Sequence, residues 1–300
     1  MLFYAKEWSF VNYRPGKFQS LLKFRLFAKP NTLQTLPIST EGEEFLMLLD
    51  VVVTFPLFTD PVIFNSSKYA TFPQYKLEAR QRDYITSLQR TLSHSYVSNV
   101  HLLYDQPQII HYIEAHVKTD FGKLRFHKVK DNKVANIAFE FVFSQLRGRL
   151  VMLTQADVYP GQGLELIKKD IMVSKKLVYA LTRHGRLEKN CDMRGDPTSR
   201  SCSDQAYRGS HDAYIFVPEG ELPQTAWEAL NHTSHYKGID NVIIYTFKDL
   251  LKYKVLNPCK VIYVYHFHCS GVRPRGVKRI NGLFNFTWSH GRSIPTDKLF

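Results

Sequence analysis

The sequence lacks the short motifs that mark several large enzyme classes. Its 300 residues contain no G-x-G-x-x-G, no P-loop, no G-x-S-x-G and no H-E-x-x-H, which argues against dinucleotide oxidoreductases, NTPases, serine hydrolases and zinc proteases. The four cysteines include no C-x-x-C pair, which disfavours a zinc ribbon. The longest apolar run, residues 45–58, contains Asp50 and is shorter than the ~20 residues of a membrane helix, so we expect no transmembrane span.

The start of the chain also lacks the features of a secretory signal. Residues 1–17 have neither an apolar core nor a small-residue cleavage site, so the chain taken as given is predicted to be cytoplasmic. N-glycosylation sequons at Asn65, Asn231 and Asn285 favour the secretory pathway and a glycoprotein instead, although sequons also arise by chance. Both locations stay open on these observations.

Acidic residues are few compared with basic ones. The chain has 27 Asp and Glu against 40 Lys and Arg, a net charge of +13. Such an excess is typical of proteins that bind nucleic acid, an anionic surface or a phosphate-bearing small ligand. The basic residues are scattered, with no dense basic run, so we expect no nucleic-acid partner and assign most of them to a solvated surface.

The cysteines fall into two local pairs in the second half of the chain. Cysteines that lie close together in a sequence suit short-loop disulfides in an oxidising compartment. This spacing predicts one bridge between Cys191 and Cys202 and a second between Cys259 and Cys269. Four reduced thiols are the alternative.

Hydrophobic periodicity predicts strands that alternate with helices. Continuous or alternating apolar runs of strand length are separated by segments whose apolar residues recur at helical spacing. This order predicts an α/β fold with a doubly wound, mostly parallel sheet and helices on both of its faces. The predicted strands are residues 45–54, 99–104, 123–129, 150–154 and 176–181, and the predicted helices are residues 80–94, a segment opened by Pro107, and a segment around 134–142.

The first part of the chain differs from the rest. Residues 1–44 show little periodicity and contain several prolines, so they are predicted to form an N-terminal extension, and residues 45–300 are predicted to form a single domain. Residues 188–209 are rich in polar residues and glycine, which predicts a long functional or mobile loop.

One acid follows the strand predicted at 150–154. The segment reads LVMLTQADVYPGQG, in which Asp157 lies just before a break at Pro160 and Gly161. Ligands of open parallel sheets bind beyond the carboxyl ends of the strands, so we expect Asp157 to face a ligand. Together with a histidine such as His266, this carboxylate could hold Mg²⁺ or Mn²⁺.

Three further polar stretches lie beside strand-like runs. GSHDAYIF contains Asp212, GIDN contains Asp240, and YHFHCS contains His266 and His268. Asp240 opens a helix, so it is expected to cap that helix, or else to take a proton from an attacking hydroxyl. His266 and His268 alternate along a strand, which predicts that they face opposite sides and do not share a metal. We expect His268 to be structural.

Taken in order, these stretches resemble the nucleotide-sugar-dependent glycosyltransferases of the GT-A fold, over roughly residues 46–273. QADVY resembles the variant of the D-x-D segment that holds the metal and the donor diphosphate, and GSHDAYIF resembles an acceptor-side segment. GIDN, with the later YKVLNP, resembles the acidic motif and the turn after its helix. YHFHCS with Arg273 resembles the terminal histidine segment. Gln155 stands where the family usually carries Asn or Asp.

The resemblance implies a hexosyltransferase-like enzyme that moves a sugar from a nucleotide-sugar donor to a hydroxyl of a glycan, lipid or protein acceptor. It implies a divalent metal cofactor, Mn²⁺ or Mg²⁺, an inverting single displacement, and a place in the Golgi or another secretory-pathway lumen. The nucleotide-binding half would be residues 45–160, the acceptor-binding half residues 161–275, and the C-terminal tail residues 276–300. The competing hypothesis is an inactive relative that binds a glycan or a partner.

Site roles also follow from the resemblance. Asp157 and His266 would hold the metal. Asp157, Gln155 and Arg273 would bind the donor. Asp240 would be the general base, kept ionised by the amide end of its helix, and Asp212 is the second candidate for that role.

Overall fold

The computed structural model describes residues 48–58, 71–184, 202, 211–234, 236–272, 279–280 and 296–300. The predicted N-terminal extension, residues 1–44, lies outside the described residues. Most of the long loop predicted at 188–209, and Arg273, also lie outside them.

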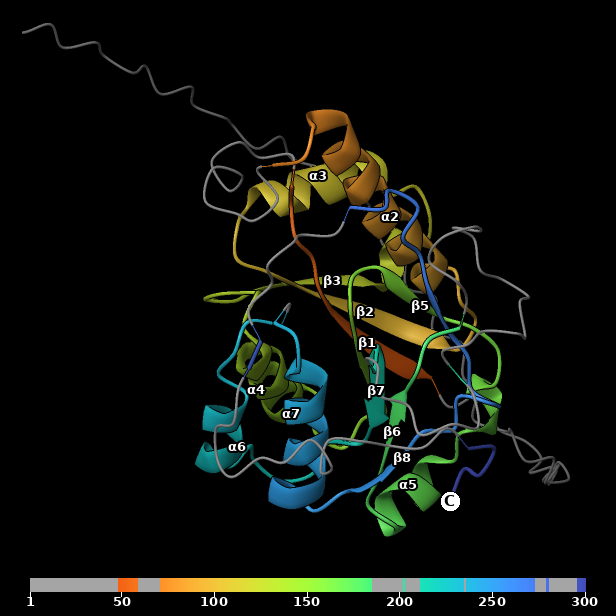
Figure 1. Cartoon of the computed structure of the whole chain (residues 1–300). Helices are drawn as coiled ribbons and strands as arrows, with labels where there is room; N and C mark the ends of the chain where they lie inside the picture. Colours follow the sequence, from red (N-terminus) through yellow and green to blue (C-terminus); the bar gives the residue numbers. More distant parts are fainter. Residues whose placement is uncertain are drawn as a thin grey trace, which may run out of the picture. The chain divides into compact units, whose positions relative to one another are not determined.

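A seven-stranded sheet forms the centre of the described residues (Figure 1). Its strand order is β3-β2-β1-β4-β7-β6-β8, and every neighbouring pair is parallel except the two that involve β7. A separate ribbon pairs β5 with β9. The strands are β1 (Leu49–Thr54), β2 (Val97–Tyr104), β3 (Leu124–Lys128), β4 (Val151–Thr154), β5 (Val158–Pro160), β6 (Leu177–Leu181), β7 (Ala213–Phe216), β8 (Lys254–Leu256) and β9 (Val264–His266).

Helices cover both faces of this sheet. Alternate residues of β1 show the two sides: Val51 and Val53 pack into one hydrophobic cluster, and Val52 packs into the other. Helices α2, α3 and α5 contribute to the first cluster, whereas α4, α6 and α7 contribute to the second. The helices are α2 (Gln74–Leu92), α3 (Gln108–His116), α4 (Ala135–Gln145), α5 (Lys169–Ser174), α6 (Gln224–Ala229) and α7 (Ile239–Tyr245), with a π-helical turn at Thr246–Leu250 and short 3₁₀ turns at Phe121–Lys123 and Leu164–Leu166.

This architecture confirms the predicted fold class, an α/β fold with a mostly parallel sheet between two layers of helices. Strands buried on both faces read as continuous apolar runs, which is why 150–154 and 176–181 predicted β4 and β6 so closely. The prediction of α2 began six positions too late, because the helix starts directly after Pro73.

The predicted disulfides are wrong. Cys202 is bonded to Cys259, with 6.0 Å between their Cα atoms, so neither Cys191–Cys202 nor Cys259–Cys269 is present. Proximity in the sequence misled the prediction. Cys202 lies in the segment after β6, and Cys259 follows β8. Because β6 and β8 are parallel neighbours, the chain leaves both strands at the same edge of the sheet.

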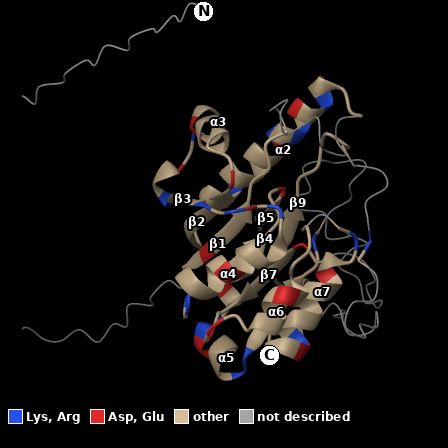
Figure 2. Cartoon of the chain, turned by 90° about the vertical axis from the view of Figure 1, so that its left-hand side faces the viewer, with Lys and Arg blue, Asp and Glu red and all other residues tan. Residues whose placement is uncertain are grey.

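The described residues show three further features. No helix in the described ranges combines the length and the apolarity needed to cross a bilayer. Basic and acidic residues are interspersed over the described ribbon (Figure 2). Asn231, the one sequon asparagine among the described residues, is exposed.

Candidate active site

Three acids from distant parts of the sequence, Asp157, Asp212 and Asp240, meet beside the carboxyl edge of the sheet. Asp157 follows β4, and Asp212 precedes β7. Because β7 runs antiparallel to β4, the start of β7 lies beside the end of β4, with Thr154 opposite Ala213. The Thr154 hydroxyl donates to the carbonyl of Asp212 at 3.1 Å.

All three acids line one cavity of about 470 Å³. Asp240 reaches it from the first turn of α7. Gln155 also lines the cavity and is exposed. The structure therefore brings together Asp157, Gln155, Asp212 and Asp240, four of the residues selected from the sequence.

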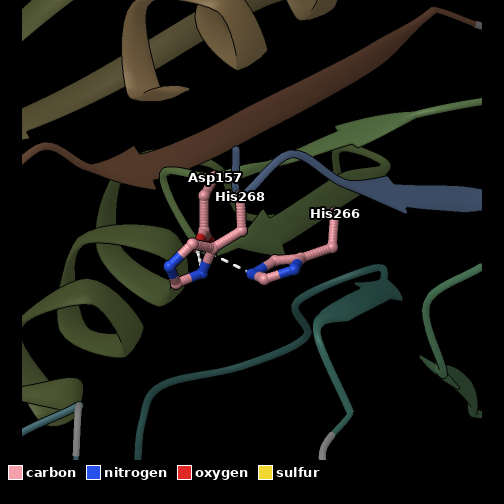
Figure 3. Close-up of side chains that lie close together, drawn as sticks. All are labelled: Asp157, His266 and His268. Carbon is pink, nitrogen blue, oxygen red and sulfur yellow. Dashed lines mark hydrogen bonds and ion pairs between the residues drawn. The ribbon is translucent and has the colours of Figure 1, made fainter. Parts of the chain in front are cut away.

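The β5–β9 ribbon carries His266 to Asp157. Val158 pairs with His266 in the ribbon, and the backbone N–H of Phe267 donates to the Asp157 carbonyl at 2.7 Å. Nε2 of His266 consequently lies 2.8 Å from Oδ2 of Asp157 (Figure 3). Gly163 adopts a φ of 96°, and a Cβ there would collide with the carbonyl of Val261. Glycine at this position therefore lets the chain after β5 approach the segment before β9.

His268 joins the same group, contrary to the prediction that it faces away from His266. Its Nδ1 lies 4.0 Å from Oδ2 of Asp157, and its Nε2 lies 3.0 Å from the carbonyl oxygen of Val272. The alternation argument fails because β9 ends at His266, so the strand geometry does not extend to His268. Figure 3 shows both imidazoles directed at the Asp157 carboxylate.

Helix α2 closes this site with two residues that the sequence analysis missed. Arg80 forms a hydrogen-bonded ion pair with Oδ2 of Asp157, and its guanidinium lies 4.4 Å from the ring centroid of Tyr84. Asp83 accepts hydrogen bonds from the backbone N–H groups of Cys269 and Ser270, both at 3.1 Å, and from the Ser270 hydroxyl at 2.7 Å. The helix therefore holds both Asp157 and the segment that carries His268.

The signal for Arg80 was available in the sequence. Leu77, Arg80 and Tyr84 lie at i, i+3 and i+7 of one helix, and all three are buried. A charged side chain on the apolar face of a helix is rarely buried without a partner. Its partner, Asp157, is 77 positions away and could not be found from local spacing.

Asp157 is ionised in this environment. Burial alone would raise its pKa, but the charges and hydrogen bonds of His266 and Arg80 outweigh burial and hold the pKa of Asp157 well below its usual range.

The cluster of Asp157, His266 and His268 fits a divalent cation. One ligand atom from each residue lies within 4.8 Å of the others, and all three residues are buried. The hydrogen bond to Val272 assigns the His268 proton to Nε2 and leaves the Nδ1 lone pair toward Asp157. Nδ1 of His266 is buried without a hydrogen-bond partner in the described part of the chain. One carboxylate and two imidazoles form a ligand set for a first-row divalent transition metal.

Asp212 and Asp240 are a second pair of acids that line the cavity and interact with each other. Nη1 of Arg183 lies 3.1 Å from Oδ1 of Asp212, and the Arg183 backbone N–H donates to Oδ2 at 3.3 Å. Burial and the charge of Asp212 raise the pKa of Asp240 to about 8, against the opposing effects of Arg183, the His211 backbone and Tyr214. Burial also raises the pKa of Asp212.

Two expectations about Asp240 are therefore wrong. Gly238, with a φ of 92°, occupies the N-cap position of α7, and Asp240 lies in the first turn without capping it. The helix end was expected to keep Asp240 ionised. In the structure, burial and the neighbouring carboxylate outweigh any such effect and favour the protonated acid at neutral pH.

Comparisons with known proteins identify similar structures only at low similarity. No protein-family profile and no curated protein sequence matches the chain. Among solved structures, GalNAc-T7 with UDP, GalNAc and Mn²⁺ aligns at a TM-score of 0.42 and 10% identity, over 75% of this chain and 44% of that one. A putative glucose-1-phosphate thymidylyltransferase from Bacillus anthracis, in complex with a sucrose, aligns at 0.40 and 10% identity, over 73% and 89%.

A third similar structure is 4-diphosphocytidyl-2C-methyl-D-erythritol synthase from Anaerococcus prevotii. It aligns at a TM-score of 0.37 and 12% identity, over 76% of this chain and 92% of that one. These scores are too low to transfer a site to this chain. The order and direction of its strands, with helices on both faces, give the chain the α/β fold with a mostly parallel sheet that was expected from its sequence.

Proposed function

We propose that the protein is a glycosyltransferase that moves a sugar from a nucleotide-sugar donor to a hydroxyl acceptor. One observation carries the proposal: Asp157 and its cationic partner Arg80 line the same cavity as the two acids Asp212 and Asp240. A transferase of this class needs positive charge for a leaving diphosphate and a proton acceptor for the incoming hydroxyl, and the lining of this cavity offers both.

The donor diphosphate would lie against Asp157, His266 and His268. A divalent cation held by these residues would supply positive charge to the leaving phosphate. This chain orients its own ligands: Asp157 through Arg80, and His268 through the Val272 carbonyl. Gln155 brings no charge, so Asp157 is the one acid that QADVY contributes.

The acceptor hydroxyl would lie against Asp240. Its oxygen attacks the anomeric carbon as the bond from that carbon to the phosphate oxygen breaks, and its proton passes to the Asp240 carboxylate. This is an inverting single displacement. Asp212 is the second candidate for the base, but its ion pair with Arg183 makes it the weaker proton acceptor.

The two predicted halves of the domain match the proposed donor and acceptor sides only in part. Residues 45–160 would supply most of the donor side and residues 161–275 most of the acceptor side, but His266 and His268 cross to the donor side. A secretory-pathway lumen such as the Golgi is supported by the Cys202–Cys259 bridge, because disulfides persist in oxidising compartments.

The Arg80–Asp157 ion pair favours the second candidate function, an inactive relative that binds a glycan or a partner, because Arg80 already neutralises the carboxylate that a metal would use.

A panel of nucleotide sugars, incubated with Mn²⁺ and followed by chromatography, distinguishes the transferase from the inactive relative. Release of the nucleoside diphosphate by the wild type, and its loss in Asp240→Asn, supports an enzyme. Nucleotide binding without any turnover supports the inactive relative.

A further inference from the structure

Arg80 is a buried cation that faces the cavity. Two cationic side chains line the cavity among the described residues, Lys133 and Arg80. Lys133 is exposed, whereas Arg80 is only 6% exposed. A buried charge interacts with a ligand far more strongly than an exposed one, because little water screens it.

The position of the guanidinium is fixed on several sides. It packs over the Tyr84 ring, pairs with Oδ2 of Asp157, and lies 3.4 Å from Oδ2 of Asp83. Asp83 is itself held by the backbone of Cys269 and Ser270. A group that is oriented in this way before the ligand arrives loses little freedom when the ligand binds.

The guanidinium also has more N–H donors than its two carboxylate partners engage. It carries five N–H groups, and its Nε is buried without a hydrogen-bond partner in the described part of the structure. The two carboxylates near it engage Nη1 and Nη2. The remaining donors form a planar fork of the kind that binds phosphate oxygens.

From this geometry we propose that Arg80 binds the donor diphosphate directly, so that part of the nucleotide affinity needs no metal. The inference rests on the proposed function, because that function supplies the diphosphate. Asp157 would bridge two sources of positive charge, Arg80 on one side and the metal held with His266 and His268 on the other. The metal would add to binding without being its sole source.

Calorimetric titration in EDTA tests this on the unmodified protein. UDP, GDP and CDP are compared with their nucleosides, first in EDTA and then in Mn²⁺. We expect one nucleoside diphosphate to bind in EDTA at least about tenfold more tightly than its nucleoside, the difference that one charge-assisted hydrogen bond of ~1.5 kcal/mol supplies. Equal affinity for diphosphate and nucleoside in EDTA would overturn the proposal.

Variants then assign this difference to Arg80. In Arg80→Gln the preference for the diphosphate in EDTA should disappear, while Mn²⁺ still restores part of the binding. Arg82→Gln is the matched control, since it removes the same charge from the exposed side of α2 and should bind like the wild type. An Arg80→Gln protein that keeps the preference in EDTA would contradict the proposal.

Failure of the proposed function and failure of the Arg80 proposal give different results in this titration. If no diphosphate binds even with Mn²⁺, the proposed function fails. If a diphosphate binds in Mn²⁺ but not in EDTA, only the role of Arg80 fails. If Arg80→Gln does not fold, Arg80→Lys replaces it, because lysine keeps the charge but not the planar fork. The preference of Arg80→Lys for the diphosphate in EDTA should fall below that of the wild type. An unchanged preference would count against the proposal.

Discussion

Nε2 of His266 lies 2.8 Å from Oδ2 of Asp157, although the two residues are 109 positions apart in the chain. The β5–β9 ribbon creates this contact, because it pairs the residue after Asp157 with His266. The contact places a histidine from the end of the chain beside the acid that follows β4. The proposed metal site depends on this contact, because the contact brings His266 within reach of a cation bound by Asp157.

Removal of either histidine should weaken metal binding. We expect His266→Ala and His268→Ala each to lower the Mn²⁺ affinity by more than the roughly 10–100-fold that loss of an outer-shell partner costs. Titration of Mn²⁺ followed by electron paramagnetic resonance measures this affinity. His116→Ala, on the exposed side of α3, is the control. Wild-type affinity in His268→Ala would show that His268 is structural after all.

Asp240→Asn should fold and bind the donor but transfer sugar slowly. Loss of a general base costs roughly 10²–10⁴-fold in rate. Asp240 does not cap α7, so the amide should leave the helix start intact. Transfer rates for Asp240→Asn and Asp212→Asn, measured side by side, identify the base. An inactive Asp212→Asn beside a fully active Asp240→Asn would assign that role to Asp212.

The raised pKa of Asp240 also makes stability depend on pH. The group has a pKa of about 8 in the folded protein, against 3.8 for an ordinary Asp. The folded state therefore holds a proton that the unfolded state releases, and the free energy of unfolding falls as the pH rises from about 4 through about 8. Asp240→Asn lacks this loss, so its stability relative to the wild type should increase over that range.

Urea unfolding of both proteins at acidic, neutral and mildly alkaline pH measures this difference. The same ionisation predicts that the transfer rate of the wild type rises with pH up to about 8. A stability difference that stays constant with pH would mean that Asp240 titrates at its ordinary pKa.

The Cys202–Cys259 bridge should stabilise the fold substantially. It joins residues 57 positions apart, and closing a loop of that length is worth about 4 kcal/mol in the chain-entropy treatment. We expect the double variant Cys202→Ser/Cys259→Ser to lose about 2–5 kcal/mol of unfolding free energy. Mass spectrometry of non-reduced peptides checks the pairing. A Cys259–Cys269 peptide in its place would contradict the structure.

Local patterns predicted the sheet and the acids at its edge. The apolar run at 150–154 matches β4 because both of its faces are covered by helices, so burial is recorded in consecutive residues. Asp157 could be selected because it directly follows such a run. Asp212 could be selected as a polar residue next to a strand, although its position beside β4 depends on the antiparallel direction of β7.

Contacts between distant segments were not predictable in this way. Arg80 and Asp157 come from different elements, and nothing in the spacing of either links them. The direction of His268 depends on where β9 ends, which the alternating pattern does not reveal. The Cys202–Cys259 pairing depends on the strand order β6-β8. Each of these features required the three-dimensional arrangement.

The most direct test of the central claim is a thermal-shift screen of nucleotide sugars, with and without Mn²⁺, on the wild type and on Asp157→Asn. A ligand at about 100 times its Kd stabilises the folded state by about 2.7 kcal/mol, which corresponds to a rise in Tm of roughly 5–10 °C. We predict such a rise for at least one nucleotide sugar, larger with Mn²⁺, and loss of the Mn²⁺-dependent part in Asp157→Asn. No rise with any nucleotide sugar, or an unchanged Mn²⁺-dependent rise in Asp157→Asn, would contradict the account.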